Sequence, residues 1–294
     1  MGLMRIEPQT ISHLQEWAGK TESTKDTVTV APVRALSATL DHLDPDPIKG
    51  DFLPELWHWL YFLPHARQSE IGPDGHPKRG GFMPPVPLPR RMWAGSRLQW
   101  LAPLTVGEDI ERVSTIQSVT HKSGRSGDLI FVLVKHEISN QNGLALIEEH
   151  DIVYRDVAGA NDKPVAPTPA PTNAIWSKTI TPDDVLLFRY SALTFNGHRI
   201  HYDRKYVTEV EGYPGLIVHG PLIATLLADL VRQSIPACKL KRFEFRAIRP
   251  AFDIHPLKVC AKPDLENDPS GKTILIWAQD HEGWLTMQAT AVLA

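Results

Sequence analysis

Three side chains that can take part in acid–base or water-binding chemistry lie in one short stretch, FRYSALTFNGHRIHYD, residues 188–203: Asn196, His198 and His201. Imidazole has an ordinary pKa of about 6.5, so a histidine can accept and return a proton near neutral pH. An amide can form hydrogen bonds with water but does not take up a proton there. The apolar residues and the RIHYD turn around them are typical of packing and scaffold. The stretch therefore predicts a reactive loop, whose chemistry depends on the elements that position it.

The composition predicts a soluble globular protein. The chain has 294 residues, of which 42% are hydrophobic, and a formal net charge of −3. A nearly neutral chain without a run of Lys and Arg argues against nucleic acid as a partner. Its cysteines, Cys238 and Cys260, are too few for a disulfide framework. The most apolar window, residues 56–64, is too short to cross a bilayer. We therefore expect a cytoplasmic protein with neither a membrane nor a nucleic-acid partner.

The chain divides into two similar halves joined by a linker. Residues 156–175 are rich in Pro and Ala and have no apolar period, as is typical of a linker. Blocks of similar sequence follow in the same order on either side: 27–40 with 179–193, 96–110 with 243–257, 126–143 with 270–283, and 145–155 with 284–294. The pattern predicts an N-terminal domain of residues 1–155 and a C-terminal domain of residues 176–294.

One segment of the second half has the pattern of a buried helix. HGPLIATLLADLVRQ, residues 219–233, places Pro221 in the first turn after Gly220 and is apolar nearly all round. The rest of this half consists of long strand-like runs separated by short turns. A long antiparallel sheet wrapped round one buried helix is a hot-dog fold. The repeat therefore predicts an α+β double hot-dog, with two antiparallel sheets that each surround a helical segment.

The first half departs from the repeat where its own helix is expected. Residues 50–95 are rich in Pro and Gly and include a long segment that has no counterpart in the second half. Loops of this length in compact domains tend to be functional. We therefore expect the first half to have a degenerate catalytic loop and to contribute to substrate and CoA binding, while the second half carries out catalysis.

The loop of the second half resembles the signature of the MaoC-like, or type 2, enoyl-CoA hydratase family, which runs roughly Gly-Asp-x-Asn-Pro-x-His before the hot-dog helix. The catalytic His of the family corresponds to His201, and its catalytic Asp corresponds to Asn196. The Asn and Pro of the signature correspond to His198 and Arg199. In the family, a backbone amide at the start of the helix holds the thioester oxygen, which implies the amide of Gly220 here.

The resemblance implies a hydro-lyase that acts reversibly on an α,β-unsaturated CoA thioester. Hydration adds water at Cβ and a proton at Cα, and the enolate that develops needs donors at its oxygen. An amide stands where the family has a carboxylate, so His201 is expected to be the base and Asn196 to orient the water. The CoA belongs to the substrate, and no other cofactor is expected.

Candidate residues for substrate binding lie in both halves. PVPLPRRMWAG, residues 85–95, together with the reactive loop is similar to the mesaconyl-CoA and itaconyl-CoA hydratases, which implies an acyl group that carries a carboxylate. Arginine binds carboxylates in a bidentate manner, but exposed arginines also form surface ion pairs, and charges on a Pro-rich loop are often simply solvated. The candidates are His198, Arg199 and Arg189, with Arg91 for the CoA phosphates, Trp93 for packing on CoA, and His219.

Other interpretations of the same residues remain open. A hot-dog acyl-CoA thioesterase would direct water to the thioester carbonyl with the help of a carboxylate near the helix, and Asp229 is expected to lie too deep for this. A third possibility is an acyl-binding protein without catalysis. His198, His201 and His219 lack the spacing and the glutamate of metalloproteases, so no metal is predicted. A homodimer is expected.

Overall fold

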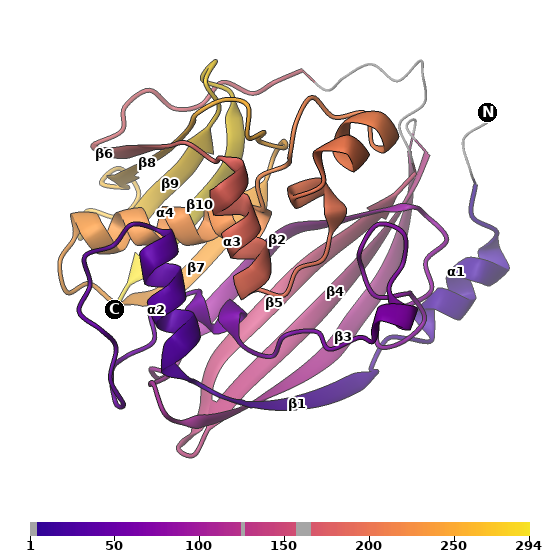
Figure 1. Ribbon diagram of the computed structural model, residues 1–294, viewed down its shortest axis with the longest axis horizontal. Coiled ribbons are helices and arrows are strands. Elements are labelled where there is room, and N and C mark those ends of the chain that lie inside the picture. Colours follow the sequence, from indigo (N-terminus) through magenta and orange to yellow (C-terminus); the bar gives the residue numbers. More distant parts are fainter. Residues whose placement is uncertain (1–4, 125–126, 157–165) are drawn as a thin grey trace.

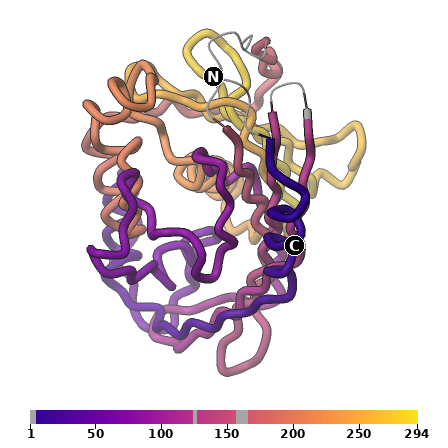
Figure 2. The backbone as a smooth tube through the Cα atoms, turned by 90° about the vertical axis from the view of Figure 1, so that its right-hand side faces the viewer, coloured from indigo at the N-terminus to yellow at the C-terminus, as the bar shows by residue number. Residues whose placement is uncertain are grey.

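The strands of the protein form one continuous sheet. The computed structural model describes residues 5–124, 127–156 and 166–294. Within these residues ten antiparallel strands follow the order β1-β3-β4-β5-β2-β7-β10-β9-β8-β6, and helices α2, α3 and α4 lie on one side of them (Figures 1 and 2). The strands are β1 (Thr21–Thr27), β2 (Arg90–Trp100), β3 (Asp109–Gly124), β4 (Gly127–Asn140), β5 (Gly143–Arg155), β6 (Trp176–Ile180), β7 (Leu240–Ala247), β8 (Leu257–Pro263), β9 (Thr273–Gln279) and β10 (Leu285–Leu293).

The strand order repeats about its centre, as the internal similarity of the sequence predicts. Strands β1, β3, β4, β5 and β2 of the first half correspond in order to β6, β8, β9, β10 and β7 of the second. The two sets meet where β2 pairs with β7, with Ser96 opposite Phe245 and Leu98 opposite Phe243. The two predicted sheets are therefore joined edge to edge into one, and each covers the exposed edge of the other.

The predicted central helix of the second half is α4 (Gly220–Ser234). Every residue from Leu222 to Val231 is buried, because the helix is enclosed on all sides. It contacts β6, β8, β9 and β10, and it packs into the main hydrophobic core. A sheet that wraps round one buried helix is the hot-dog arrangement. No helix in the described ranges has the length and apolar character needed to span a bilayer.

The first half has no long helix in the equivalent place. The chain there forms the short 3-10 turn η1 (Trp57–Leu60), which lies beside α2 (Val30–Thr39). Helix α2 also packs against α3 (Asp184–Leu193) of the second half (Figure 1). The main core includes residues of η1, α2 and α3, so the halves share one hydrophobic interior. The short helix α1 (Pro8–Gln15) belongs to a second apolar cluster, with β3 and β4.

The predicted domain limits remain a prediction, because the sheet runs through both halves. The described strands of the first half end at Arg155, and those of the second begin at Trp176. Residues 157–165 of the predicted linker lie outside the described residues. The rest of the linker pairs with the second half, where the Ala170 amide donates to the carbonyl of Gly283 at 3.0 Å.

A buried carboxylate on β5 links this strand to the η1 turn of the first half. Glu148 on β5 is 2% exposed and lies 2.9 Å from Nε2 of His58 and 2.6 Å from Nε2 of His150, and the indole of Trp59 donates to it at 3.0 Å. Burial opposes ionisation, but the two imidazoles together hold the pKa of Glu148 well below its usual range. Glu148 is therefore an ionised centre to which the side chains of His58, Trp59 and His150 are bonded.

Replacing Glu148 with alanine is expected to lower the free energy of unfolding by about 3–5 kcal/mol, because it leaves buried partners without an acceptor. Urea denaturation measures this change. The matched control is Glu149→Ala, which removes the next carboxylate along β5, one that forms a part-exposed pair with Arg97. The control is expected to cost about 1 kcal/mol or less. Equal losses for the two variants would contradict the central role of Glu148.

Candidate active site

The reactive loop is positioned by the end of α3. This helix begins with a side-chain cap, in which Asp183 accepts from the amide of Leu186, and it ends at Leu193. The chain then turns through Phe195, which has a φ of 47°, and continues into the single turn η3 (Arg199–His201). Residues 195–201 are called the histidine loop below.

Asn196 shapes the histidine loop through its side chain. Its Oδ1 accepts a hydrogen bond from the amide of His198 at 3.0 Å, and its own amide donates to the carbonyl of Ser191 at 2.8 Å. This is the local turn that Asn side chains commonly stabilise. The carboxamide nitrogen of Asn196 remains able to donate, and its oxygen is already engaged. This oxygen keeps a second lone pair, so the predicted water-orienting role of Asn196, by donation or by acceptance, stays a prediction.

His201 has the geometry of a neutral base. Its Nδ1 lies 2.7 Å from the carbonyl oxygen of Ile217, which can only accept, so Nδ1 carries the hydrogen and Nε2 is left as an acceptor. The residue is 8% exposed. Burial lowers the pKa of His201 to about 4, against the opposing effect of the Ile217 hydrogen bond. At neutral pH the ring is therefore uncharged and able to accept a proton from water.

The ring of His219 stacks against that of His201. The two rings are stacked, with centroids 3.7 Å apart and planes 18° apart. His219 is fully buried, its Nε2 lies 2.8 Å from Oγ of Ser191, and burial lowers its pKa well below 6.5. Because His219 has no exposed surface, we assign it the support of His201 in place of the predicted contact with substrate.

The start of α4 lies directly after this histidine pair. His219 is the residue before the helix, and Gly220 is its first residue. The first amides of an α-helix have no acceptor within the helix and carry partial positive charge. The Gly220 amide is one of these amides, and its predicted contact with the thioester oxygen stays a prediction.

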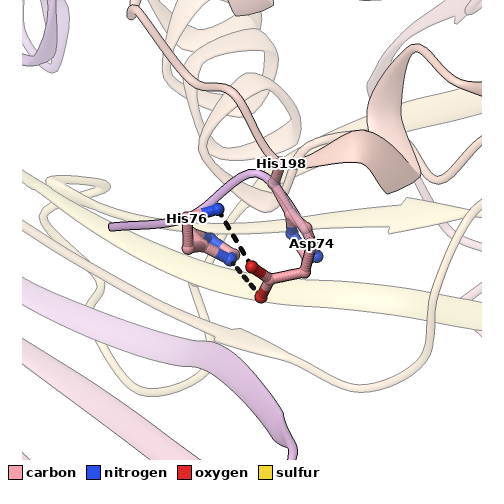
Figure 3. Close-up of side chains that lie close together, drawn as sticks. All are labelled: Asp74, His76 and His198. Carbon is pink, nitrogen blue, oxygen red and sulfur yellow. Dashed lines mark hydrogen bonds and ion pairs between the residues drawn. The ribbon is translucent and has the colours of Figure 1, made fainter. Parts of the chain in front are cut away.

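A segment of the first half reaches the histidine loop. Residues 65–95, called the Pro-rich segment below, place Asp74, Gly75 and His76 against it. The amide of Arg199 donates to the carbonyl of Asp74 at 2.9 Å, and the rings of His76 and His198 have centroids 4.0 Å apart. Asp74 and His76 form a pair, in which Oδ2 lies 3.0 Å from Nδ1 and Oδ1 accepts from the His76 amide at 3.1 Å (Figure 3).

Asp74 and His76 are not among the site residues predicted from the sequence. The Pro-rich segment is predicted to be functional through its basic and aromatic residues only. The signal available was an acid and a histidine on either side of a glycine in GPDGH, residues 72–76. Nothing in that pattern indicates a contact with a loop more than a hundred residues further along the chain.

His198 lies between the two groups of histidines. Its ring centroid is 4.0 Å from that of His76 and 5.4 Å from that of His201. Burial, together with the neighbouring imidazoles, lowers the pKa of His198 to about 2. One nitrogen or oxygen from each of Asp74, His76 and His198 lies within 4.8 Å of the others, a spacing that a metal ion also tolerates. The rings of His76, His198, His201 and His219 follow one another in a continuous row, called the histidine row below.

Arg199 is engaged within the protein. Its guanidinium donates to Oδ2 of Asp203 and to the carbonyl of Pro73, and it lies 4.1 Å above the ring of Tyr206. These contacts fasten the histidine loop to the Pro-rich segment. We therefore assign Arg199 a structural role in place of the predicted contact with a substrate carboxylate.

The other predicted substrate-binding residues occupy three different places. Arg91 is half-buried on β2, and its positive charge contributes to the lowered pKa values of His76 and His198, so it lies near the site. Trp93 packs in the interior against Trp59 and Phe245, and its indole donates to the carbonyl of Gly95. Arg189 is exposed on α3. Of the three, Arg91 is the one linked to the histidine row.

The carboxylate that a thioesterase would need is committed elsewhere. Asp229 lies on α4, well past the Gly220 end, and its Oδ2 is 2.8 Å from Nε2 of His42. Its Oδ1 accepts from Arg232 at 2.9 Å. Asp229 is 5% exposed, so it is enclosed within this network. The geometry agrees with the expectation that Asp229 does not activate water for attack on a thioester.

The stability of the protein is expected to fall as the pH drops below about 6.5. Burial lowers the folded-state pKa of five histidines: His76, His136, His198, His201 and His219. Near pH 5.5 the unfolded chain binds protons at these positions that the folded protein does not, so the free energy of unfolding decreases. Urea denaturation between pH 7.5 and 5 measures the proton uptake on unfolding. For His198→Gln this uptake is expected to fall by about one proton per molecule near pH 5.5, and an unchanged uptake would contradict a neutral His198.

A neutral imidazole beside the first amides of the helix inside a hot-dog sheet can direct water onto an unsaturated thioester. This arrangement is the one expected for a hot-dog hydro-lyase. A family model described as hydroxyacyl-thioester dehydratase type 2 matches residues 56–253, which is more than half of the chain. The chain belongs to this family, as the resemblance of its histidine loop predicts.

Individual relatives agree with the family and with the fold. The chain is 46% identical over 285 residues to a mesaconyl-C(4)-CoA hydratase of Chloroflexus aurantiacus, covering 94% of this chain and 96% of the relative. A solved MaoC-like dehydratase superposes with a TM-score of 0.70 at 14% identity, over 95% of this chain and 99% of the other. A Mycobacterium tuberculosis protein described as a double hotdog fold superposes with a TM-score of 0.56 at 13% identity, over 97% and 98%. The predicted double hot-dog is confirmed.

Proposed function

We propose that the protein reversibly hydrates a short enoyl-CoA thioester whose acyl group carries a carboxylate, of the mesaconyl-C4-CoA or itaconyl-CoA type. The observation that carries the proposal is the hydrogen bond from Nδ1 of His201 to the Ile217 carbonyl, which leaves Nε2 as a neutral acceptor next to the start of α4. The mesaconyl-C(4)-CoA hydratase that is 46% identical supports the choice of substrate.

In this mechanism the protein moves one proton and stabilises one negative charge. Nε2 of His201 accepts a proton from water as the water oxygen forms a bond with Cβ. The electrons of the double bond move toward the thioester oxygen, and the Gly220 amide donates to the enolate that forms. The proton then passes to Cα, so that the product carries OH on Cβ and H on Cα and the enzyme returns to its initial state.

Arg91 is the best-placed candidate for an anionic group of the substrate. Its charge acts on both His76 and His198, and its strand β2 continues directly from the Pro-rich segment. A guanidinium recognises carboxylates and phosphates in a bidentate manner. The homodimer and the cytoplasmic location that the sequence predicts remain predictions.

The test follows the absorbance of the enoyl-thioester band when purified protein is mixed with mesaconyl-C4-CoA, itaconyl-CoA or crotonyl-CoA, with free thiol measured in parallel. Loss of the band without free CoA is the expected result, and the two carboxylate-bearing substrates are expected to exceed crotonyl-CoA in kcat/KM. Release of free CoA would favour the thioesterase. No change with any of the three would contradict the proposal.

A further inference from the structure

The histidine loop has one acceptor nitrogen whose tautomer is fixed by a hydrogen bond, Nε2 of His201. A water held for attack is best fixed when both of its hydrogens are bonded, because its oxygen lone pair then has one direction. His201 can accept one hydrogen. At position 196 the carboxylate of the family signature is an amide, and its Oδ1 already accepts from the amide of His198. A second acceptor nitrogen of fixed tautomer is found outside this loop.

The Pro-rich segment supplies a histidine with a suitable free nitrogen. Oδ2 of Asp74 lies 3.0 Å from Nδ1 of His76. An ionised Asp74 accepts a hydrogen bond from Nδ1–H, which leaves Nε2 of His76 as an acceptor. Hydrogen bonds from His76 hold the pKa of Asp74 below its usual range, against the opposing effect of burial. No described residue is bonded to Nε2 of His76, whose ring is part-exposed. The pair is therefore prepared to accept a hydrogen bond from a molecule in the site.

The pair is held against the histidine loop by backbone contacts. The Arg199 amide donates to the carbonyl of Asp74, and the Arg199 side chain donates to that of Pro73. Gly75 has a φ of +90°, and a Cβ there would lie 1.7 Å from the carbonyl oxygen of Gly197. The two segments approach so closely that glycine is required at Gly75, which fixes the residues on both sides of it in place.

The same contacts bring His76 to the reacting end of the site. Its ring contacts that of His198, whose other neighbour is His201. Figure 3 shows Asp74 and His76 on one turn with His198 beside them. The row of rings thus joins a carboxylate-supported imidazole of the first half to the base of the second.

We infer that Asp74 and His76 complete the active site, with His76 as a catalytic residue that accepts the second hydrogen of the reacting water and Asp74 as the residue that positions it. This inference rests on the proposed function. One O–H of the water donates to His201 and the other to His76. As the oxygen bonds to Cβ, the first of these hydrogens leaves as a proton to His201 and later reaches Cα, while the second stays on the new hydroxyl group.

The inference is tested with His76→Phe, His76→Gln and Asp74→Asn, by measuring kcat and KM with the substrate that the wild type prefers. His76→Phe removes the acceptor and is expected to lower kcat by about 100-fold or more, with KM within about threefold. His76→Gln keeps an acceptor oxygen and is expected to recover part of the loss. Asp74→Asn is expected to lower kcat by at least about tenfold, because it no longer fixes the His76 tautomer.

The matched control is Glu70→Gln, which removes another carboxylate of the Pro-rich segment, one that is bonded to Arg67 on the surface. It is expected to leave both constants unchanged. Retention of kcat by His76→Phe, or a rise in KM alone, would overturn the inference while leaving the hydratase proposal intact. An inactive wild type would instead contradict the proposed function. The near-isosteric variant Asp74→Asn keeps the test valid if His76→Phe does not fold.

Discussion

Replacing His201 with alanine is expected to lower kcat for hydration by about 10²–10⁴-fold, the usual contribution of a positioned acid–base group. Among the described histidines, His201 combines a neutral ring, a fixed tautomer and a place beside the first amides of α4. A water molecule that takes the place of the imidazole in the variant lacks the fixed orientation that the Ile217 carbonyl gives this ring. The measurement is the initial rate of enoyl-band loss at saturating substrate.

The control for this variant is His281→Ala. His281 also stacks on a second histidine, His255, with ring centroids 3.6 Å apart, but outside the histidine row. Its loss is expected to leave kcat unchanged. If His201→Ala kept more than about a tenth of the wild-type kcat, the base would have to be another residue of the row, and His198 would be the first to test.

The second large effect is expected for Gly75→Ala. An added Cβ would lie 1.7 Å from the carbonyl oxygen of Gly197, and the backbone of Gly75 is in the left-handed region with a φ of +90°. The Pro-rich segment must therefore move away from the histidine loop, and it carries Asp74 and His76 with it. We expect kcat to fall by about 100-fold, since a displacement of 1 Å in a catalytic group can have this effect.

Gly80→Ala separates the clash from the backbone strain. Gly80 lies in the same segment with a φ of +98°, but the nearest atom to an added Cβ is 3.8 Å away. Both variants are expected to lose about 1–3 kcal/mol of stability through strain, and only Gly75→Ala is expected to lose activity. Equal kinetic effects would show that close contact between the two segments is not required. Circular dichroism and urea denaturation establish that both proteins are folded.

The elements that the sequence predicts well are those defined by local pattern. Helix α4 follows from an apolar run with Pro221 in its first turn, and the likeness of the two halves follows from similar blocks in the same order. His201 could be located because a short loop before that helix resembles a known signature. The joining of the two sheets at β2 and β7 could not be predicted, because a period of two in a strand does not indicate which strand lies at its edge.

The parts of the site that were not predicted from the sequence depend on contacts between distant segments. Asp74 and His76 reach the histidine loop across the two halves, and only the folded chain brings them together. For Arg199 the residue type was compatible with both a substrate contact and an internal one. The carboxylate of Asp203 and the carbonyl of Pro73 favour the internal contact.

The pairing of β2 with β7 joins two hot-dog halves of one chain, in the way that two identical subunits would otherwise be joined. In a symmetric pair of subunits, each substitution occurs in both copies, so the loop and the helix of each copy must tolerate it. Here the Pro-rich segment occurs once, in the half that has no long helix, and it can be shaped to serve the single histidine loop of the other half. Covalent fusion thus allows the two halves to diverge, and each molecule is expected to bind one equivalent of a tight inhibitor per chain.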